Sequence, residues 1–167
     1  MCAYLSSLME LALMEASKAF EEGEVPVGAV VASKEGNVMG IAHNRSISLH
    51  DPTGHAEILA IRNASEKIGN YRLTGCYLIT TIEPCIMCMG AALHARIETL
   101  VFGAKDPKGG AAGSLYNLAE DTRLNHKITV MSGILEKECS EIIRIFFQKR
   151  RGTEEAVTGA TRNRLVG

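Results

Sequence analysis

Several ordinary features are scarce in this 167-residue sequence. It has no tryptophan, and only 5% of its residues are aromatic. The core must therefore be built mainly from aliphatic side chains, methionine and alanine. No apolar run approaches the roughly 18 residues that a membrane-spanning helix needs, and the amino terminus lacks the basic and apolar regions of a secretory signal. We therefore expect a cytoplasmic protein with no membrane role.

Charge of either sign is not in excess. The chain has 18 Lys and Arg residues against 19 Asp and Glu, for a formal net charge of −1. A nucleic-acid partner needs only local positive charge, so this balance neither supports nor excludes one. The length and the 46% content of hydrophobic residues predict one globular domain with a full core.

Cysteine is present in an odd number. The five residues are Cys2, Cys76, Cys85, Cys88 and Cys139. Without a secretory signal, this pattern favours reduced thiols and metal binding over a disulfide framework.

Apolar spacing predicts an α/β domain over residues 1–151. We expect strands near residues 27–31, 38–42, 76–82, 99–103 and 127–131, with helices near residues 5–22, 54–67 and 85–93 and after Ser132. A hairpin followed by strands that alternate with helices implies a five-stranded mixed sheet covered on both faces, a three-layer α/β/α arrangement. Residues 152–167 form a polar tail that we expect to be mobile.

A Cys-x-x-Cys pair dominates the chemistry of the sequence. Cys85 and Cys88 follow Pro84 at the end of an apolar strand. Because Pro84 suits the first turn of a helix, the two thiolates should lie one turn apart, as a zinc ion requires. With His55 as the third ligand and water as the fourth, the site is of the catalytic type, since structural zinc sites are normally closed by a fourth Cys or His.

Glu57 is two residues beyond His55, about 200° around an ideal helix. The two side chains can both approach a metal only if it lies off the amino-terminal end of that helix. Glu57 is then placed to act as a general acid and base, not as a ligand.

Other interpretations of these cysteines are a redox pair or half of a structural zinc site. The presence of His55 with Glu57, and the absence of a second nearby Cys pair, favour the catalytic zinc site. The remaining histidines are expected to be structural or exposed: His43, His50, His94 and His126.

His55-Ala-Glu57 followed by Pro84-Cys85-x-x-Cys88 resembles the signature of the zinc-dependent nucleoside and nucleobase deaminases. More narrowly, several segments resemble the bacterial tRNA-specific adenosine deaminases, in the same order and at the same spacing: residues 24–29, 50–53, 70–73, 82–85, 101–104, 110–114 and 124–126. The resemblance covers about residues 5–151. It implies a cytidine-deaminase-like fold with one Zn²⁺ per chain.

The resemblance also implies a reaction and partners. Water activated by zinc attacks C6 of the wobble adenosine in a tRNA anticodon stem-loop, and Glu57 transfers the protons, so that inosine and ammonia form. It implies that Asn44 holds the base or ribose, that Asp106 faces flanking nucleotides, and that Phe147 and Arg150 contact the RNA. It further implies a homodimer.

Plainer roles exist for several of these residues. Asn44 and Asp106 are also ordinary turn residues, and Phe147 has the spacing of a core residue. The apolar stretch 87–93 is either core or part of the homodimer interface.

Two other functions stay open. A deaminase of a free base or nucleoside, such as guanine, cytosine or cytidine, has the same fold, but segments 110–114 and 124–126 argue against it. A catalytically inactive RNA-binding subunit that keeps zinc for stability is argued against by Glu57.

Overall fold

The computed structural model describes the backbone of residues 2–164 and the side chains of residues 4–152. The elements in chain order are α1 (Cys2–Glu21), β1 (Gly28–Ser33), β2 (Val38–His43), α2 (Ala56–Ile68), β3 (Cys76–Ile82), α3 (Ile86–His94), β4 (Thr99–Ala104), β5 (Thr129–Ser132) and α4 (Glu136–Arg164). All five strands and all four helices lie close to the ranges that the apolar spacing predicts.

One mixed sheet organises the domain. Its strand order is β2-β1-β3-β4-β5. Strand β1 runs antiparallel to both β2 and β3, whereas β4 runs parallel to both β3 and β5. The predicted five-stranded mixed sheet is therefore confirmed.

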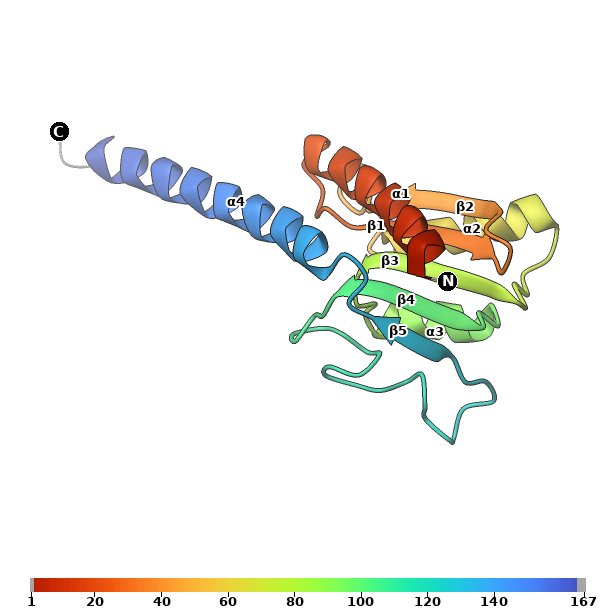
Figure 1. Cartoon of the computed structure of the whole chain (residues 1–167). Coiled ribbons are helices and arrows are strands. Elements are labelled where there is room, and N and C mark those ends of the chain that lie inside the picture. Colours follow the sequence, from red (N-terminus) through yellow and green to blue (C-terminus); the bar gives the residue numbers. More distant parts are fainter. Residues whose placement is uncertain (1, 165–167) are drawn as a thin grey trace.

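Helices cover both faces of this sheet (Figure 1). Successive residues of β1 alternate between two hydrophobic clusters, as a strand buried on both sides requires. Ala29 and Val31 pack with α2 and α3, while Val30 and Ala32 pack with α1 and the start of α4. The predicted three-layer α/β/α arrangement is confirmed.

Two glycines let helices lie very close to the sheet. A Cβ atom at Gly28 would lie 1.9 Å from the carbonyl oxygen of Ala12 in α1. One at Gly40 would lie 2.3 Å from the carbonyl oxygen of Ala60 in α2. No side chain fits at such distances, so these glycines set how closely α1 and α2 approach the strands. The position of α2 matters most, because its amino terminus carries His55.

Two predicted helix starts are displaced. The last helix does not begin directly after Ser132, because Ser132 still pairs with Phe102 at the end of β5, and α4 begins at Glu136. Pro84 lies before α3 and not in its first turn, since Cys85 is the N-cap residue.

Helix α4 has no break at the expected domain boundary after residue 151. Its backbone continues as helix from residue 152 to Arg164, and Figure 1 shows this half extending away from the sheet. The mobility of residues 152–167 stays a prediction, and residues 165–167 lie outside the described part of the chain. Among the described helices, none is both long enough and apolar enough to cross a membrane.

Candidate active site

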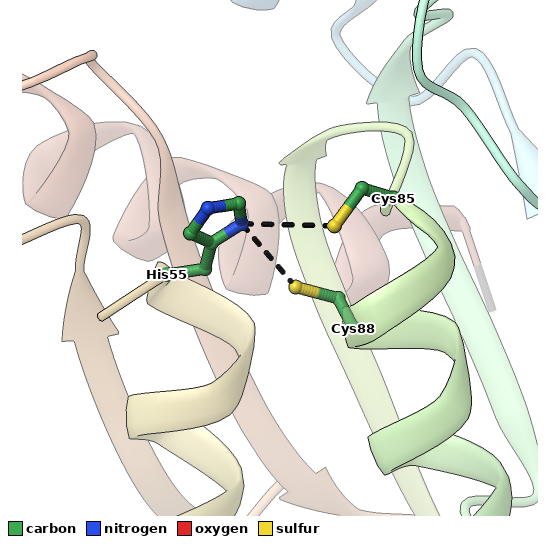
Figure 2. Close-up of side chains that lie close together, drawn as sticks. All are labelled: His55, Cys85 and Cys88. Carbon is green, nitrogen blue, oxygen red and sulfur yellow. Dashed lines mark hydrogen bonds between the residues drawn. The ribbon is translucent and has the colours of Figure 1, made fainter. Parts of the chain in front are cut away.

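The amino-terminal ends of α2 and α3 meet at one point (Figure 2). His55 is the N-cap residue of α2, and Cys85 is the N-cap residue of α3. Cys88 lies in the first turn of α3, so its side chain points to the same place. The two helices leave β2 and β3 at the same end of the sheet, which brings residues 30 positions apart in sequence together.

The three side chains are placed to hold a metal ion, and no other such group occurs among the described residues. His55 Nδ1 lies 3.7 Å from Cys85 Sγ and 3.6 Å from Cys88 Sγ. Tetrahedral zinc with Zn–S bonds of about 2.3 Å and Zn–N bonds of about 2.0 Å separates such ligand atoms by about 3.6 Å. One nitrogen and two sulfur donors also suit zinc by their chemistry. The residues present therefore fit one zinc ion.

The protonation of the two thiols is coupled. A hydrogen bond from Cys88, together with His55, lowers the pKa of Cys85 to about 3 against the opposing effect of burial. The same hydrogen bond to Cys85, together with burial, raises the pKa of Cys88. The bond to Cys85 also raises the pKa of His55. A cation bound between the two sulfurs would favour the thiolate form of both cysteines.

Glu57 lies beside this group at the start of α2. Only 3% of its surface is exposed. Burial raises the pKa of its carboxyl group, although its own backbone N–H and nearby His55 oppose the shift. A carboxyl group that takes up a proton more readily than usual is suited to proton transfer.

A cavity of about 960 Å³ opens onto these residues. The predicted site residues that line it come from loops and helices far apart in sequence: Asn44, His55, Glu57, Cys85, Asp106, Phe147 and Arg150. Cys88 is fully buried behind them. The structure therefore brings all eight predicted residues to one place.

Two buried glutamates that line the cavity were not among the predicted site residues. Glu24 is 1% exposed and Glu83 is 2% exposed. Both occur in segments that carry the family resemblance, residues 24–29 and 82–85. The sequence alone does not assign either glutamate a separate role. A glutamate directly beside an apolar strand is the signal that could have identified them, since such a carboxylate needs buried partners.

Glu24 holds the loop that carries Asn44. Its carboxylate accepts the backbone N–H of Ile47 at 3.1 Å and that of Ser48 at 2.7 Å. It also accepts the side-chain amide of Asn44 at 3.5 Å. Burial pushes the pKa of Glu24 up, but these hydrogen bonds outweigh burial and hold it below its ordinary value.

Glu83 holds the opposite wall in the same way. Its carboxylate accepts hydrogen bonds from the loop that follows β4 and carries Asp106. The hydrogen bonds from Ser114, Asp106 and Ala112 again outweigh burial and lower the pKa of Glu83.

Helix α4 forms the rim of the cavity. Phe146 is 5% exposed and packs edge-on against Phe20 of α1. Phe147, the next residue, is 45% exposed and faces the cavity. The guanidinium of Arg150 lies 5.6 Å from the ring of Phe146. Phe146 is thus a core residue that also contacts the Arg150 guanidinium, and Phe147 presents an exposed ring to the cavity.

The other histidines lie outside the group that could hold a metal. His43 contacts Glu15 at 2.7 Å and Glu22 at 3.3 Å, which ties β2 to α1. His126 bonds the carbonyl oxygen of Ile97 at 2.7 Å. His50 and His94 are exposed. The prediction of structural or surface roles is confirmed for these four.

Comparison with known proteins agrees with this geometry. The model of the cytidine and deoxycytidylate deaminase zinc-binding region matches residues 4–104. A tRNA-specific adenosine deaminase of Haemophilus influenzae is 51% identical over 144 residues, which cover 86% of this chain and 83% of the relative. One of Bacillus subtilis is 45% identical over 148 residues, which cover 89% of this chain and 91% of the relative.

A solved structure shows the same relationship. It comes from work on A-to-I editing by tRNA A34 deaminases at the wobble position of transfer RNA, and it is 46% identical to this chain with a TM-score of 0.79. The match covers 81% of this chain and 98% of that one. The chain therefore belongs to the zinc-binding cytidine and deoxycytidylate deaminase family, and within it to the tRNA-specific adenosine deaminases.

Proposed function

We infer that this protein deaminates adenosine to inosine at the wobble position of a tRNA anticodon loop. The observation that carries the inference is the group of His55, Cys85 and Cys88 with Glu57 beside it, at the base of an open cavity. Relatives with the corresponding name and activity support the choice of substrate.

The proposed chemistry assigns a role to each residue at the bottom of the cavity. His55, Cys85 and Cys88 would hold one zinc ion, which would supply Lewis-acid activation of water near neutral pH. Glu57 takes up and releases the protons that hydrolytic deamination moves from the attacking water to the adenine ring and then to the departing amine. Its burial keeps these proton transfers away from bulk solvent.

The walls of the cavity are proposed to bind the RNA. Asn44 contacts the base or ribose, and Asp106 faces the flanking nucleotides. On the rim, Phe147 offers an exposed ring for stacking on an unpaired base, and Arg150 offers a cation for phosphate. An open cavity with an aromatic and basic rim suits a nucleotide that remains part of a chain.

The direct test is incubation of the zinc-loaded protein with an anticodon stem-loop that has adenosine at the wobble position. We expect inosine, scored by mass spectrometry after digestion, and no product when cytidine replaces that adenosine. The same assay is run with guanine, cytosine, cytidine and free adenosine. Activity on a free base or nucleoside, with none on the stem-loop, would contradict this function and support the alternative one.

We also propose that the protein is a homodimer. On α3, Met89 and Ala92 are fully buried in the core and so do not belong to an interface. The outer face of the same helix has Ile86 at 50% exposure, next to a 280 Å³ depression that Leu93 and Leu124 also line. An exposed apolar face of this kind supports an interface. Light scattering should give twice the monomer mass, and Ile86→Arg should give the monomer mass.

A cytoplasmic location completes the proposal. Cys76, Cys85, Cys88 and Cys139 form no disulfide bond, and cysteines stay reduced under the conditions of the cytoplasm. A fluorescent fusion seen in the cytoplasm would agree with it, and one seen in the cell envelope would not.

A further inference from the structure

Glu83 occupies an unusual place for a charged side chain. It follows the last residue of β3 and precedes Pro84 and Cys85, and only 2% of its surface is exposed. Removing a carboxylate from water is costly unless hydrogen-bond donors replace the water. The donors around Glu83 therefore indicate what the carboxylate does.

All four hydrogen bonds recorded for this carboxylate come from one loop, residues 105–114. Oε2 accepts the N–H of Asp106 at 3.2 Å and the hydroxyl of Ser114. Oε1 accepts the N–H of Ala112 at 3.0 Å and that of Ser114 at 2.9 Å. The loop thus bends around the carboxylate and contacts it at its beginning, middle and end.

The loop sequence is adapted to this buried group. A Cβ atom at Gly110 would lie 2.4 Å from Cδ of Glu83, so only glycine lets the loop close around it. Beside it, Ala111 donates its N–H to the carbonyl oxygen of Pro84 at 2.8 Å. The buried carboxylate therefore explains why glycine occupies position 110.

The same loop supplies a wall of the cavity. Asp106 and Lys108 both line it, and the N–H of Asp106 is itself bound to Glu83. A carboxylate can only accept, so a glutamine at this position would direct an N–H group at the N–H donors of the loop. The loop would then lose its fixed shape while the ligands of the metal group remain.

We propose that Glu83 is a positioning residue that holds the 105–114 loop ready for the nucleotides that flank the target adenosine. This inference rests on the proposed function, because the flanking nucleotides belong to an RNA substrate. A loop that is already ordered before RNA binds loses less conformational entropy on binding. Glu83 therefore acts on affinity and on flanking-nucleotide preference and leaves the proton transfers to Glu57.

The test compares Glu83→Gln with the wild-type protein on anticodon stem-loops that differ in the nucleotides next to the adenosine. We expect KM to rise about tenfold or more, the size of one lost hydrogen bond to a charged group, while kcat stays within about threefold. Discrimination between flanking nucleotides should fall by a similar factor, with zinc still at one per chain. Ser114→Ala, which removes one donor, should change KM in the same direction by less.

Glu120→Gln is the matched control. Glu120 lies in the following part of the same connection, is exposed, and accepts a hydrogen bond from Asn117 at 3.0 Å. Glu120 accepts none of the hydrogen bonds that Glu83 receives from the loop. The KM and the flanking-nucleotide preference of Glu120→Gln should therefore equal those of the wild-type protein.

A second measurement does not depend on the substrate. Hydrogen–deuterium exchange should be faster at the amides of Ala112 and Ser114 in Glu83→Gln than in the wild-type protein. Unchanged exchange and unchanged KM would overturn the inference. So would equal losses of zinc and kcat with KM unchanged, because Glu83 would then support Cys85 and not the loop. If the wild-type protein fails on every stem-loop, the proposed function fails, and the exchange experiment still decides whether Glu83 orders the loop.

Discussion

The side-chain amide of Asn44 donates from Nδ2 to Oε2 of Glu24 at 3.5 Å, and both residues line the cavity. Since a carboxylate only accepts hydrogen bonds, this contact determines which end of the amide faces Glu24. The residue proposed to hold the base or ribose is therefore oriented before the substrate arrives.

Glu24→Gln should lower kcat/KM on the stem-loop about tenfold or more, because the amide of Asn44 and the N–H groups of Ile47 and Ser48 lose a charged acceptor. Initial rates at low substrate concentration measure the effect. Glu22→Gln is the control, since Glu22 is a nearby exposed glutamate that contacts His43, and it should stay within about twofold of the wild-type protein. Equal rates for Glu24→Gln and the wild-type protein would show that the contact does not matter.

Acid should also weaken the fold through Glu24. Its pKa is held below the ordinary value of 4.5 in the folded protein, so the folded state binds this proton less readily than the unfolded state. The stabilisation that ionised Glu24 contributes is present above pH 4.5 and is lost as the pH falls through the folded-state pKa. Urea unfolding at decreasing pH should show a smaller acid-induced loss of unfolding free energy in Glu24→Gln than in the wild-type protein. Parallel losses would argue against this contribution.

Removal of a ligand should remove zinc. His55→Ala and Cys85→Ala should each reduce bound zinc from one per chain to a small fraction of that, because two ligands hold the ion far more weakly than three. Metal analysis after dialysis measures this. Cys76→Ala is the control, since Cys76 is buried at the other end of β3, and it should keep its zinc. Chelation should abolish wild-type activity, and added zinc should restore it.

Glu57→Gln should separate zinc binding from turnover. The amide has the size of the carboxyl group but cannot transfer a proton, so kcat should fall by a factor of about 10² to 10⁴. Zinc content should remain at one per chain, because Glu57 is not proposed as a ligand. Single-turnover rates with saturating protein measure the chemical step. Unchanged turnover would exclude the acid and base role of Glu57.

The neighbouring phenylalanines of α4 should respond differently to truncation. Phe146→Ala should destabilise the fold by about 3 to 5 kcal/mol, since Phe146 is 5% exposed and packs on Phe20. Phe147→Ala should change stability by less than about 1 kcal/mol, because its ring is 45% exposed, yet raise KM for the stem-loop. Thermal unfolding and steady-state kinetics distinguish the two effects. A loss of stability without a change of KM in Phe147→Ala would assign Phe147 to the core.

Much of the fold could be predicted because the apolar pattern changes period clearly along the chain. Strand β3 has the predicted bounds of residues 76–82, since a run of apolar residues between turn signals has few other interpretations. The start of α4 was less predictable. Ser132 is a favourable cap by residue type, but its pairing with Phe102 keeps it in the sheet.

The metal group could be predicted because its chemistry depends on residue type and short spacing. Cys85 and Cys88 are three residues apart, and His55 with Glu57 are two apart, so local geometry alone limits where these side chains point. The buried glutamates could not be predicted in this way. The groups that donate hydrogen bonds to the Glu83 carboxylate lie between 23 and 31 residues away along the chain.

The sequence by itself determined the strands, the helices, the donor atoms for zinc and the proton-transfer group, because each depends on contacts among near neighbours in the chain. The tertiary structure alone decided that α2 and α3 bring their first residues together, that α4 presents Phe147 and buries Phe146, and that Glu24 and Glu83 order the two walls of the cavity. Those relationships depend on packing against the sheet, where the positions of distant segments are set by close contacts such as that of Gly40 with Ala60.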